Sequence, residues 1–363
     1  MLFGGTYEGC RALVTGHTGF KGSWLALWLT ELGAEVAGYS LDVPTSPAHF
    51  ELLGLKNRMR HYQGDVRDRR RLADALDEFR PEVVFHLAAQ ALVRRSYEEP
   101  AVTFETNTLG TVNVLECVRT RPWIEVAVLI TSDKAYRNDE VSGGYRETDT
   151  LGGHDPYSGS KSCAELAAHS YFHSFLRHGP TRMATARAGN VIGGGDWAAD
   201  RIVPDCVRAW SQGAVAAVRS PRATRPWQHV LEPLSGYLWL GAQLWHKREG
   251  LNGEAFNFGP DAGGSQTVAE LLDAMADRWP GARWHVGSNG TGAVHEATLL
   301  KLSCDKALHY LNWHAVLGFP ETVASTVDWY RDWNGGEREI YTYSVKQIER
   351  YCHVARERNL PWA

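Results

Sequence analysis

The chain of 363 residues contains no apolar run near the ~18 residues that a membrane-spanning helix requires. Its first residues lack a charged segment followed by a long apolar run, so the sequence predicts neither a secretory signal nor a membrane partner. The net charge is only -4, and no strong overall field favours nucleic acid. Repeats and low-complexity segments are also missing. The composition, 44% hydrophobic and 22% charged, is that of a globular protein long enough for two lobes.

Cysteine is scarce, and no two cysteines form a C-x-x-C pair. The six are scattered along the chain, at Cys10, Cys117, Cys163, Cys206, Cys304 and Cys352. This spacing is typical of reduced core residues and not of a disulfide framework or a zinc site. We therefore expect a cytoplasmic protein without a bound metal.

A glycine-rich turn near the N-terminus predicts a dinucleotide site. The β-rich run 11–15 leads into Gly16-His-Thr-Gly19-Phe-Lys-Gly22, a helical pattern that stops at Gly33, and a second strand over 35–40. In this context a G-x-x-G-x-x-G pattern lets backbone N–H groups approach a pyrophosphate at the helix N-terminus. An ordinary tight turn is the alternative. The expected cofactor contacts here are Gly16, Thr18, Gly19, Phe20 and Gly22.

Alternating strands and helices continue to about residue 187. Further strands are expected over 60–66, 81–89, 126–130 and 181–187. This alternation predicts a Rossmann-type, doubly wound parallel sheet over residues 1–188, with ligands at the carboxyl ends of its strands. From residue 189 the pattern changes. Residues 189–363 are expected to form a smaller α/β substrate lobe, some of whose segments can return to the first sheet.

The end of the second strand leaves the choice between NAD and NADP open. Asp42 can hold the adenine ribose of NAD, or it can equally cap the following turn, while Lys21 lies in the glycine-rich turn. Asp65 can accept a hydrogen bond from the adenine amino group or cap the next helix. Asn107 lies in a long helical pattern and is expected to anchor the strand-end backbone. Further cofactor contacts are predicted at Val66, Leu87, Ala88 and Ala89.

The fifth strand and the helix that follows carry an oxidoreductase constellation. Ser132 comes directly after the apolar run 126–130, and Tyr157 and Lys161 are four residues apart on one helix face. The tyrosine can take a proton from a substrate alcohol, and the lysine is expected to lower the tyrosine's pKa by charge attraction. Because Tyr-x-x-x-Lys is common on helices by chance, this interpretation depends on the preceding strand and on Ser132 at its end.

The chain resembles the extended short-chain dehydrogenase/reductase family over most of its length. The matching residues are Gly16-x-x-Gly19-x-x-Gly22, Asp65-Val66, 86–89, Asn107, 131–133, Tyr157-x-x-x-Lys161 and Asn190. Within the family it most resembles the CDP-glucose 4,6-dehydratase branch, through residues 16–24, 89–96, 132–134 and 225–233. The related dTDP-glucose dehydratases carry Thr-Asp-Glu where this chain has Ser132-Asp133-Lys134.

The resemblance implies a hydro-lyase that converts CDP-glucose to CDP-4-keto-6-deoxyglucose and recycles its bound NAD. Tyr157 would take the C4 hydroxyl proton, with Ser132 orienting that oxygen or acting only as a strand-end hydrogen bonder. Asp133, with its pKa raised by burial, would protonate the departing 6-hydroxyl. Lys134 would be the base at C5. Alternatively, Lys134 pairs with an acid and leaves proton abstraction to water or another group.

Arginines after residue 200 are the candidates for the substrate diphosphate, because guanidinium groups match phosphate oxygens. Arg201 and Arg225 are preferred, Arg219 is a further candidate, and Arg222 is expected on a solvated face. Trp227 can stack on the base or pack beneath Arg225. Other predicted substrate contacts are Gln90, Arg94 and Ser96 around the hexose, with Asn190 and His229.

Three rival functions remain at this point: an extended-family enzyme on another sugar nucleotide (a dTDP- or GDP-sugar 4,6-dehydratase or a 4-epimerase), an NADPH-consuming reductase, and a non-catalytic dinucleotide binder. An epimerase does not need the Asp133-Lys134 pair, and the intact Ser132, Tyr157 and Lys161 disfavour a non-catalytic role. The family further implies a homodimer or tetramer, assembled through the helices near 100–118 and 157–176. It also implies a product used in deoxysugar biosynthesis for surface polysaccharide.

Overall fold

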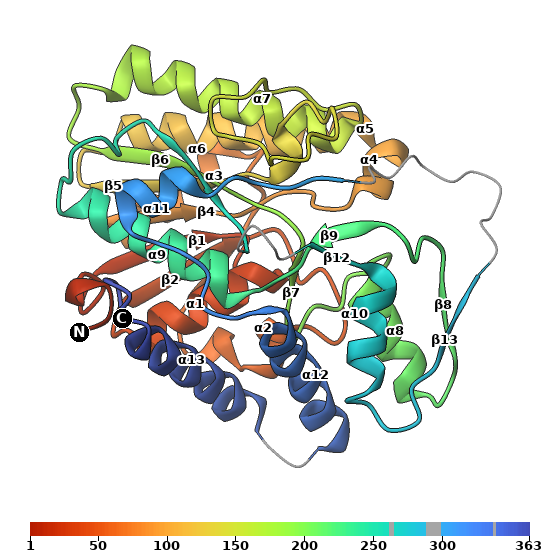
Figure 1. The fold of residues 1–363 in the computed structure, drawn as a ribbon. Helices are drawn as coiled ribbons and strands as arrows, with labels where there is room; N and C mark the ends of the chain where they lie inside the picture. Colours follow the sequence, from red (N-terminus) through yellow and green to blue (C-terminus); the bar gives the residue numbers. More distant parts are fainter. Residues whose placement is uncertain (261–264, 288–298, 337–338) are drawn as a thin grey trace.

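A parallel sheet of seven strands runs through the middle of the protein, in the order β11-β6-β5-β4-β1-β2-β3 (Figure 1). The computed structural model describes residues 1–260, 265–287, 299–336 and 339–363. Its central strands are built from apolar runs because helices cover both faces of the sheet. The strands are β1 (Arg11–Thr15), β2 (Glu35–Ser40), β3 (Arg60–Gln63), β4 (Val83–His86), β5 (Val126–Ile130), β6 (Arg182–Ala188) and β11 (Ala255–Phe258).

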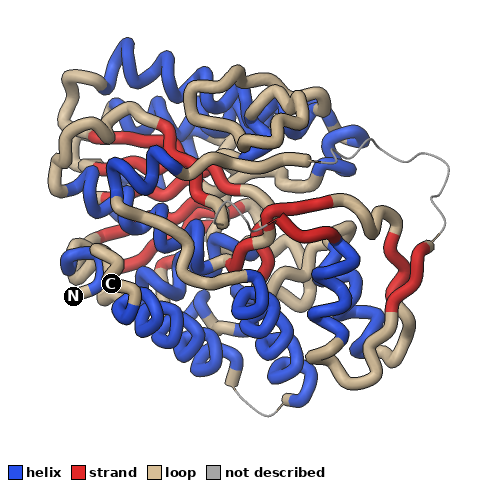
Figure 2. The backbone as a smooth tube through the Cα atoms, viewed as in Figure 1, coloured by secondary structure: helices blue, strands red, loops and turns tan. Residues whose placement is uncertain are grey.

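Two helical layers enclose the sheet, each with its own cluster of buried apolar side chains (Figures 1 and 2). One layer contains α3 (Arg69–Phe79), α6 (Gly110–Arg119) and α7 (Pro156–Tyr171). The other contains α1 (Phe20–Glu31), α9 (Leu231–Trp245) and α13 (Ile340–Glu357). This arrangement confirms the predicted Rossmann-type fold.

The strand order reverses direction at β1, which pairs with β2 on one side and with β4 on the other. Connections therefore leave the carboxyl ends of β1 and β4 on opposite sides, which is where open α/β sheets bind their ligands. The glycine-rich turn follows β1, and a short 3-10 turn, Asp133–Ala135, follows β5. After β4 the chain forms α4 (Val93–Glu98), α5 (Pro100–Phe104) and a π-helical turn, Glu105–Leu109.

A smaller group of helices and two-stranded ladders lies beside the sheet. Its helices are α8 (Ile202–Ser211), α10 (Val268–Ala276) and α12 (Phe319–Gly335). Its ladders pair β7 (Val191–Ile192) with β10 (Gln228–His229), β8 (Ala216–Val218) with β13 (Trp284–Val286), and β9 (Thr224–Pro226) with β12 (Ser265–Thr267). Two short helices, α2 (His49–Leu52) and α11 (Asp305–Leu311), complete the fold. The predicted capping box is present, since Thr267 and Glu270 exchange hydrogen bonds at the start of α10.

Segments beyond residue 188 return to the first sheet. β11 pairs in parallel with β6, so that Asn257 lies opposite Arg187. α9 and α13 pack in the same layer as α1. No helix in the described residues is both long and apolar enough to cross a membrane.

Candidate active site

The glycine-rich turn is shaped for a pyrophosphate. A Cβ atom on Gly16 would lie 2.7 Å from the backbone nitrogen of Ala88, and one on Gly22 would lie 2.1 Å from the carbonyl oxygen of Gly16. At Gly19, which precedes α1, a Cβ atom would meet only the Gly16 carbonyl oxygen within 4 Å. Because the N-cap residue Gly19 has no side chain, no side chain caps the first N–H groups of α1, and the space beside them is open. The turn fits a dinucleotide at a helix N-terminus.

The ends of β2 and β3 form a cleft next to this turn, lined by Leu41, Gln63, Gly64, Asp65, Asp68 and Arg71. The Thr18 hydroxyl donates to the Asp42 carbonyl oxygen at 2.6 Å and so ties the turn to the end of β2. The Asp42 carboxylate is exposed beside it. Partial burial alone would raise the pKa of Asp65, but Arg67 holds it below its ordinary value through hydrogen bonds. The proposed capping role of Asp65 is wrong, because Asp68 caps α3.

The loop after β4 is fixed by two buried side chains. The Thr15 hydroxyl oxygen accepts from the N–H groups of Leu87 and Ala88, each at 3.2 Å. Asn107 accepts from the Gln90 N–H at 2.8 Å and donates to the Gln90 carbonyl oxygen at 3.0 Å. Asn107 is therefore the buried anchor that we expected, although it lies in the π-helical turn and not in a regular α-helix.

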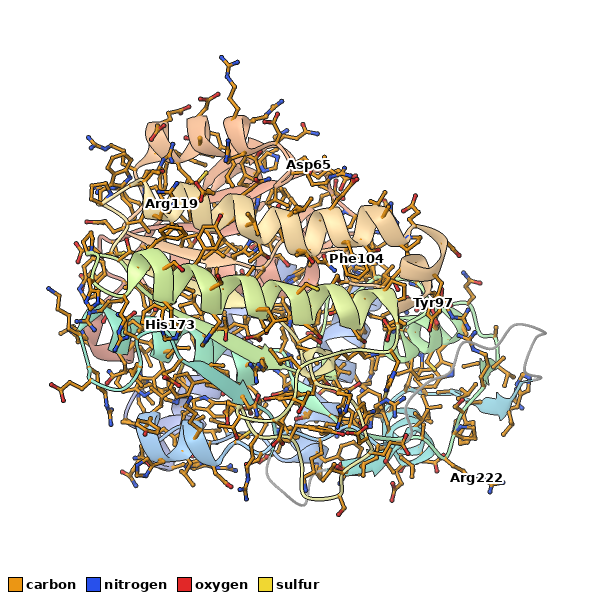
Figure 3. The ribbon with its side chains drawn as sticks, turned by 90° about the horizontal axis from the view of Figure 1, so that it is seen from above. Asp65, Tyr97, Phe104, Arg119, His173 and Arg222 are labelled. Atoms are coloured by element: carbon orange, nitrogen blue, oxygen red, sulfur yellow. The ribbon has the colours of Figure 1, made fainter. Side chains whose placement is uncertain are left out.

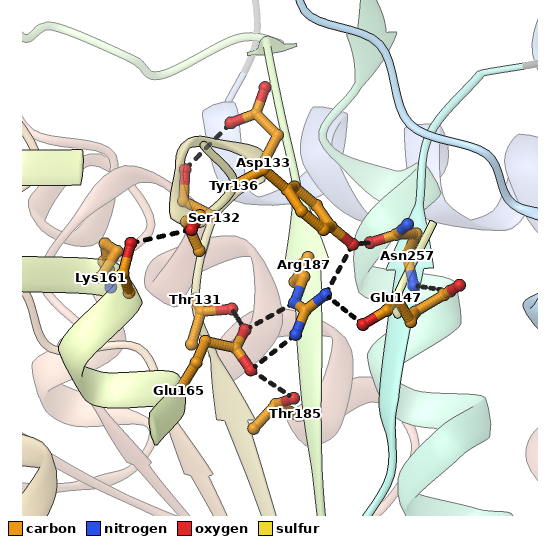
Figure 4. Close-up of polar contacts among 12 residues, drawn as sticks. Thr131, Ser132, Asp133, Tyr136, Glu147, Lys161, Glu165, Thr185, Arg187 and Asn257 are labelled. Atoms are coloured by element: carbon orange, nitrogen blue, oxygen red, sulfur yellow. Dashed lines mark hydrogen bonds and ion pairs between the residues drawn. The ribbon is translucent and has the colours of Figure 1, made fainter. Parts of the chain in front are cut away.

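Ser132, Asp133 and Lys134 form the turn after β5, next to α7. The Ser132 hydroxyl donates to Asp133 at 3.0 Å (Figure 4). It also accepts from the Lys134 N–H at 3.2 Å and hydrogen-bonds with Tyr157. Lys161, one helical turn after Tyr157, donates to the Ile130 carbonyl oxygen at 3.4 Å. The structure thus brings the five predicted catalytic residues to the carboxyl end of β5.

Burial dominates the protonation of this group. It raises the pKa of Tyr157 to about 12, although the hydrogen bond with Ser132 lowers it. The predicted lowering of the Tyr157 pKa by Lys161 is therefore not found in the protein alone. Burial lowers the pKa of Lys161 itself to about 8, and Lys21 lowers it further. Desolvation also raises the pKa of Asp133, which is the direction that an acid role at neutral pH requires.

Lys134 is half-buried. Within the described part of the chain its ammonium makes no hydrogen bond or ion pair, and the Asp133 carboxylate instead accepts from Ser132, so direct pairing of Lys134 with Asp133 is not formed. Its charge nevertheless lowers the pKa of Asp133, against the larger effect of burial.

Lys21 and Tyr237 are neighbours of the site that the sequence analysis did not assign to it. Burial lowers the pKa of Lys21 to about 8; Arg201 lowers it and Asp133 raises it. Its Nζ lies 6.0 Å from the centre of the Tyr237 ring. The Tyr237 hydroxyl is buried and has no hydrogen-bond partner among the described residues. Lys21 could have been found from its place inside the glycine-rich turn, whereas no local signal connects Tyr237 with that turn.

Of the predicted substrate contacts, Arg201 lies near Tyr157, whereas Arg94 and Arg219 gather around one acidic side chain. Arg201 forms an ion pair with Asp196 at 2.8 Å. Its positive charge also lowers the pKa of Tyr157. Arg94 and Arg219 come from different elements and both contact Asp200, at 3.0 and 3.5 Å. Arg225 lies on β9, half-buried, and donates to the Thr224 carbonyl oxygen at 2.8 Å. The backbone of Asn190, with φ 24°, accepts from the Gln228 N–H at 3.3 Å.

Three predicted substrate contacts instead hold the protein's own loops. The side-chain amide of Gln90 donates to the Leu92 carbonyl oxygen and the Thr103 hydroxyl, and it accepts from the Leu92 N–H. Ser96 is fully buried and donates to the Val93 carbonyl oxygen at 2.6 Å. His229 is fully buried, and burial lowers its pKa to about 3. Ser96 and His229 are thus closed off from solvent in the protein alone, and the amide of the half-buried Gln90 is already hydrogen-bonded, while contact of these residues with substrate stays a prediction. Trp227 is also buried and donates to the Gln266 carbonyl oxygen, which supports packing over stacking, and Arg222 is exposed as expected.

Residues 12–259 match the family model described as the NAD dependent epimerase/dehydratase family. The chain belongs to this family. Its cofactor is therefore NAD, which decides the choice that Asp42 and Lys21 left open. Among curated proteins, the chain is 47% identical over 352 residues to CDP-glucose 4,6-dehydratase of Salmonella typhimurium, covering 95% of this chain and 97% of the relative. It is 30% identical to dTDP-glucose 4,6-dehydratase of Streptomyces antibioticus, with 88% and 92% covered.

Solved structures agree with the fold. The dTDP-glucose 4,6-dehydratase of Streptomyces venezuelae, solved with NAD, matches with a TM-score of 0.74 and 25% identity, covering 91% of this family member and 99% of that chain. The structure of Pal from Bacillus thuringiensis matches with a TM-score of 0.76 and 21% identity, covering 89% and 99%. The second likeness concerns the fold alone.

Proposed function

We propose that this protein is a CDP-glucose 4,6-dehydratase, a hydro-lyase that forms CDP-4-keto-6-deoxyglucose and water. The observation that carries the proposal is the 47% identity to a CDP-glucose 4,6-dehydratase over 95% of the chain. The grouping of Ser132, Asp133, Tyr157 and Lys161 at one strand end supports it. Lys134 supports the CDP-glucose branch over the dTDP-glucose dehydratases, which the resemblance associates with glutamate at this position.

The first stage of the reaction is oxidation at C4 of the glucose. When bound, NAD supplies the redox chemistry, taking up a hydride from C4 and returning it to C6. Tyr157 receives the proton of the C4 hydroxyl, and Ser132, already bonded to Tyr157, orients the same oxygen. Because burial raises the pKa of Tyr157 to about 12, this step requires positive charge close to the phenol. Arg201 is the cation that lowers the pKa of Tyr157 in the protein alone, and Lys161 lies one helical turn after Tyr157.

The second stage removes water across C5 and C6 of the 4-keto sugar. Its carbonyl group acidifies the C5 proton, which Lys134 removes and gives back to C5 once C6 has been reduced. Asp133 gives a proton to the departing 6-hydroxyl. Burial favours the protonated carboxyl of Asp133, and Ser132 holds that carboxyl by its hydrogen bond. One carboxyl and one amine on adjacent residues can in this way act at adjacent carbon atoms.

The substrate diphosphate would bind between the sheet and the smaller lobe. Arg201 and Arg225 are its main partners in this proposal, with Arg219 beside them. Arg94 and Arg219 already converge on the carboxylate of Asp200, so an anion is held between them in the protein alone. A diphosphate can replace that carboxylate, because both guanidinium groups form charge-assisted hydrogen bonds with phosphate oxygens.

We further propose a cytoplasmic homodimer. Helices α5 and α7 and the π-helical turn carry exposed apolar side chains: Phe104 at 38%, Leu109 at 55%, Leu166 at 57% and Phe175 at 56% exposed, the last just beyond α7. Figure 3 looks onto this face, where Phe104 and Tyr97 are labelled. Several exposed apolar groups on adjacent helices favour a protein interface. The product would enter deoxysugar biosynthesis.

The test is product formation from CDP-, dTDP-, UDP- and GDP-glucose with a catalytic amount of NAD. The 4-keto-6-deoxy product is followed by its absorbance in alkali, and net reduction of the cofactor by absorbance at 340 nm. We expect conversion of CDP-glucose without net absorbance at 340 nm. Stoichiometric cofactor consumption would instead identify a reductase. Turnover of another nucleotide alone would overturn the CDP assignment.

A further inference from the structure

A buried ion pair lies directly beneath the turn that carries Ser132, Asp133 and Lys134. Glu165 on α7 and Arg187 on β6 are each 4% exposed, and Arg187 Nε donates to the Glu165 carboxylate at 2.8 Å (Figure 4). A second bond joins the same two groups at 3.1 Å. Two threonine hydroxyls also donate to the carboxylate, from Thr185 at 3.0 Å and from Thr131. The carboxylate thus accepts hydrogen bonds from two residues of β6 and from Thr131, which follows β5.

The remaining donor group of Arg187 points to Tyr136. Its Nη1 donates to the Tyr136 hydroxyl at 2.6 Å and to the Glu147 carbonyl oxygen at 3.3 Å. The guanidinium also lies 4.7 Å from the centre of the Tyr136 ring. The Tyr136 hydroxyl in turn donates to Asn257 on β11 at 2.8 Å. Arg187 therefore contacts Tyr136, which follows the turn of Ser132, Asp133 and Lys134, as well as Glu165 on α7.

Thr131 and Tyr136 are the residues on either side of the segment 132–135. Thr131 follows the last residue of β5, and Tyr136 follows the 3-10 turn Asp133–Ala135. Both of their hydroxyl groups bond to the Glu165–Arg187 pair. A third bond, from the Ser162 hydroxyl to the Ala135 carbonyl oxygen at 2.8 Å, ties the same segment to α7. The segment is therefore held at both ends by groups that lie outside the reacting site.

Glu165 is also one helical turn beyond Lys161 and two beyond Tyr157. The ion pair is thus attached to the helix that positions Tyr157 and to the turn that positions Asp133. A buried ion pair is a weak source of stability, because desolvating two charges offsets most of their attraction. Its directional bonds can still fix one arrangement among several. Two hydrogen bonds join the pair, and four more connect it to Thr131, Thr185, Tyr136 and Glu147.

Resting on the function proposed above, we propose that Glu165 and Arg187 are positioning residues, which hold Ser132, Asp133 and Lys134 in register with Tyr157 through Thr131 and Tyr136. Neither side chain is assigned a contact with substrate. The pair connects the residues of the oxidation stage with those of the water-loss stage. Both stages must use one bound sugar, so their relative placement decides the rate of the second.

The chain offers a matched pair of variants that leaves the ion pair intact. Thr131→Val and Thr185→Val each remove one hydroxyl donor to Glu165, but only Thr131 adjoins the catalytic turn. We expect Thr131→Val and Tyr136→Phe each to lower kcat by about tenfold, as small displacements of reacting groups do. KM should stay within about twofold of the original. Thr185→Val should leave kcat within about twofold.

A second measurement does not depend on turnover. Hydrogen–deuterium exchange of the peptide covering residues 131–137 reports how tightly the turn is held in the protein alone. We expect exchange there to be at least about threefold faster in Thr131→Val and Tyr136→Phe than in Thr185→Val. Circular dichroism checks that all three variants are folded.

The outcomes separate this proposal from the assigned activity. If the parent protein converts none of the four nucleotide sugars, the proposed function fails and the exchange measurement alone decides the positioning role. If the parent is active, folded Thr131→Val and Tyr136→Phe proteins with unchanged kcat would overturn the positioning role. Equal exchange of residues 131–137 in all three variants would overturn it as well. Equal losses of kcat in Thr131→Val and Thr185→Val would indicate general destabilisation instead and also contradict it.

Discussion

Replacing Lys161 with methionine should abolish activity and at the same time stabilise the protein in the absence of NAD. Lys161 is 6% exposed, and its ammonium makes one long hydrogen bond, 3.4 Å to the Ile130 carbonyl oxygen. Burial, followed by the charge of Lys21, lowers its pKa from 10.5 to about 8, and Glu165 acts in the opposite direction. Methionine has a similar length and carries no charge that folding must remove from water.

The expected gain follows from the pKa change. A change from 10.5 to about 8 corresponds to ~3 kcal/mol at ~1.4 kcal/mol per pKa unit. Since the folded-state pKa lies below the unfolded one, the cost is fully present below about pH 8, where lysine is protonated in both states. As the pH rises from about 8 to 10.5, the folded protein releases the proton first and the cost disappears. Lys161→Met should therefore be more stable by ~3 kcal/mol at pH 7 and by much less near pH 10.

Urea unfolding of the NAD-free protein at pH 7 and pH 10 measures this difference. Lys346→Met is the control, because Lys346 is exposed on α13, and its free energy of unfolding should change little at either pH. A Lys161→Met protein less stable than the parent at pH 7 would refute the reasoning. A gain of equal size at both pH values would refute it too, because packing and not charge would then explain the gain.

Three further predictions concern the reaction and its cofactor. Tyr157→Phe should lower product formation by at least about 100-fold, the usual contribution of a general base; residual turnover near the parent rate in the alkaline absorbance assay would remove Tyr157 from its role. Lys134→Ala should slow water loss more than oxidation at C4, so absorbance at 340 nm should accumulate on the enzyme, and full turnover would show that another group is the C5 base. Gly22→Ala should weaken NAD binding by more than about tenfold, because its Cβ atom would lie 2.1 Å from the Gly16 carbonyl oxygen; unchanged tryptophan quenching on NAD titration would contradict this.

The parts of the molecule that the sequence predicted are those with a local signal. β1, β2 and β5 were recognisable because their apolar runs are bounded by turn residues, and the structure has these strands at the expected residues. The glycine-rich turn was recognisable for the same reason. Asn107 was expected to anchor the strand-end backbone, and it bonds to both backbone groups of Gln90.

The parts that were missed depend on side-chain direction and on long-range contacts. Ser96 and His229 belong to motifs near the site, but motif membership does not say that both side chains are fully buried. Asp65 and Asp68 are three residues apart, and only the end of β3 at Gln63 decides that Asp68 caps α3. The Glu165–Arg187 pair joins residues 22 positions apart on different elements, so neither residue stands out in the sequence.

The position of β11 has a consequence for how the chain can be made and divided. While residues 255–258 are still inside the ribosome, β6 is the outermost strand and presents unpaired backbone groups along the strand that carries Arg187. Exposed edges of this kind invite pairing with other chains, so the nascent protein is at risk of aggregation until β11 arrives. A fragment that stops near residue 188 would keep that edge permanently. It would also lack Asn257, the hydrogen-bond partner of Tyr136. Splitting or fusing this protein therefore requires a break point beyond residue 258.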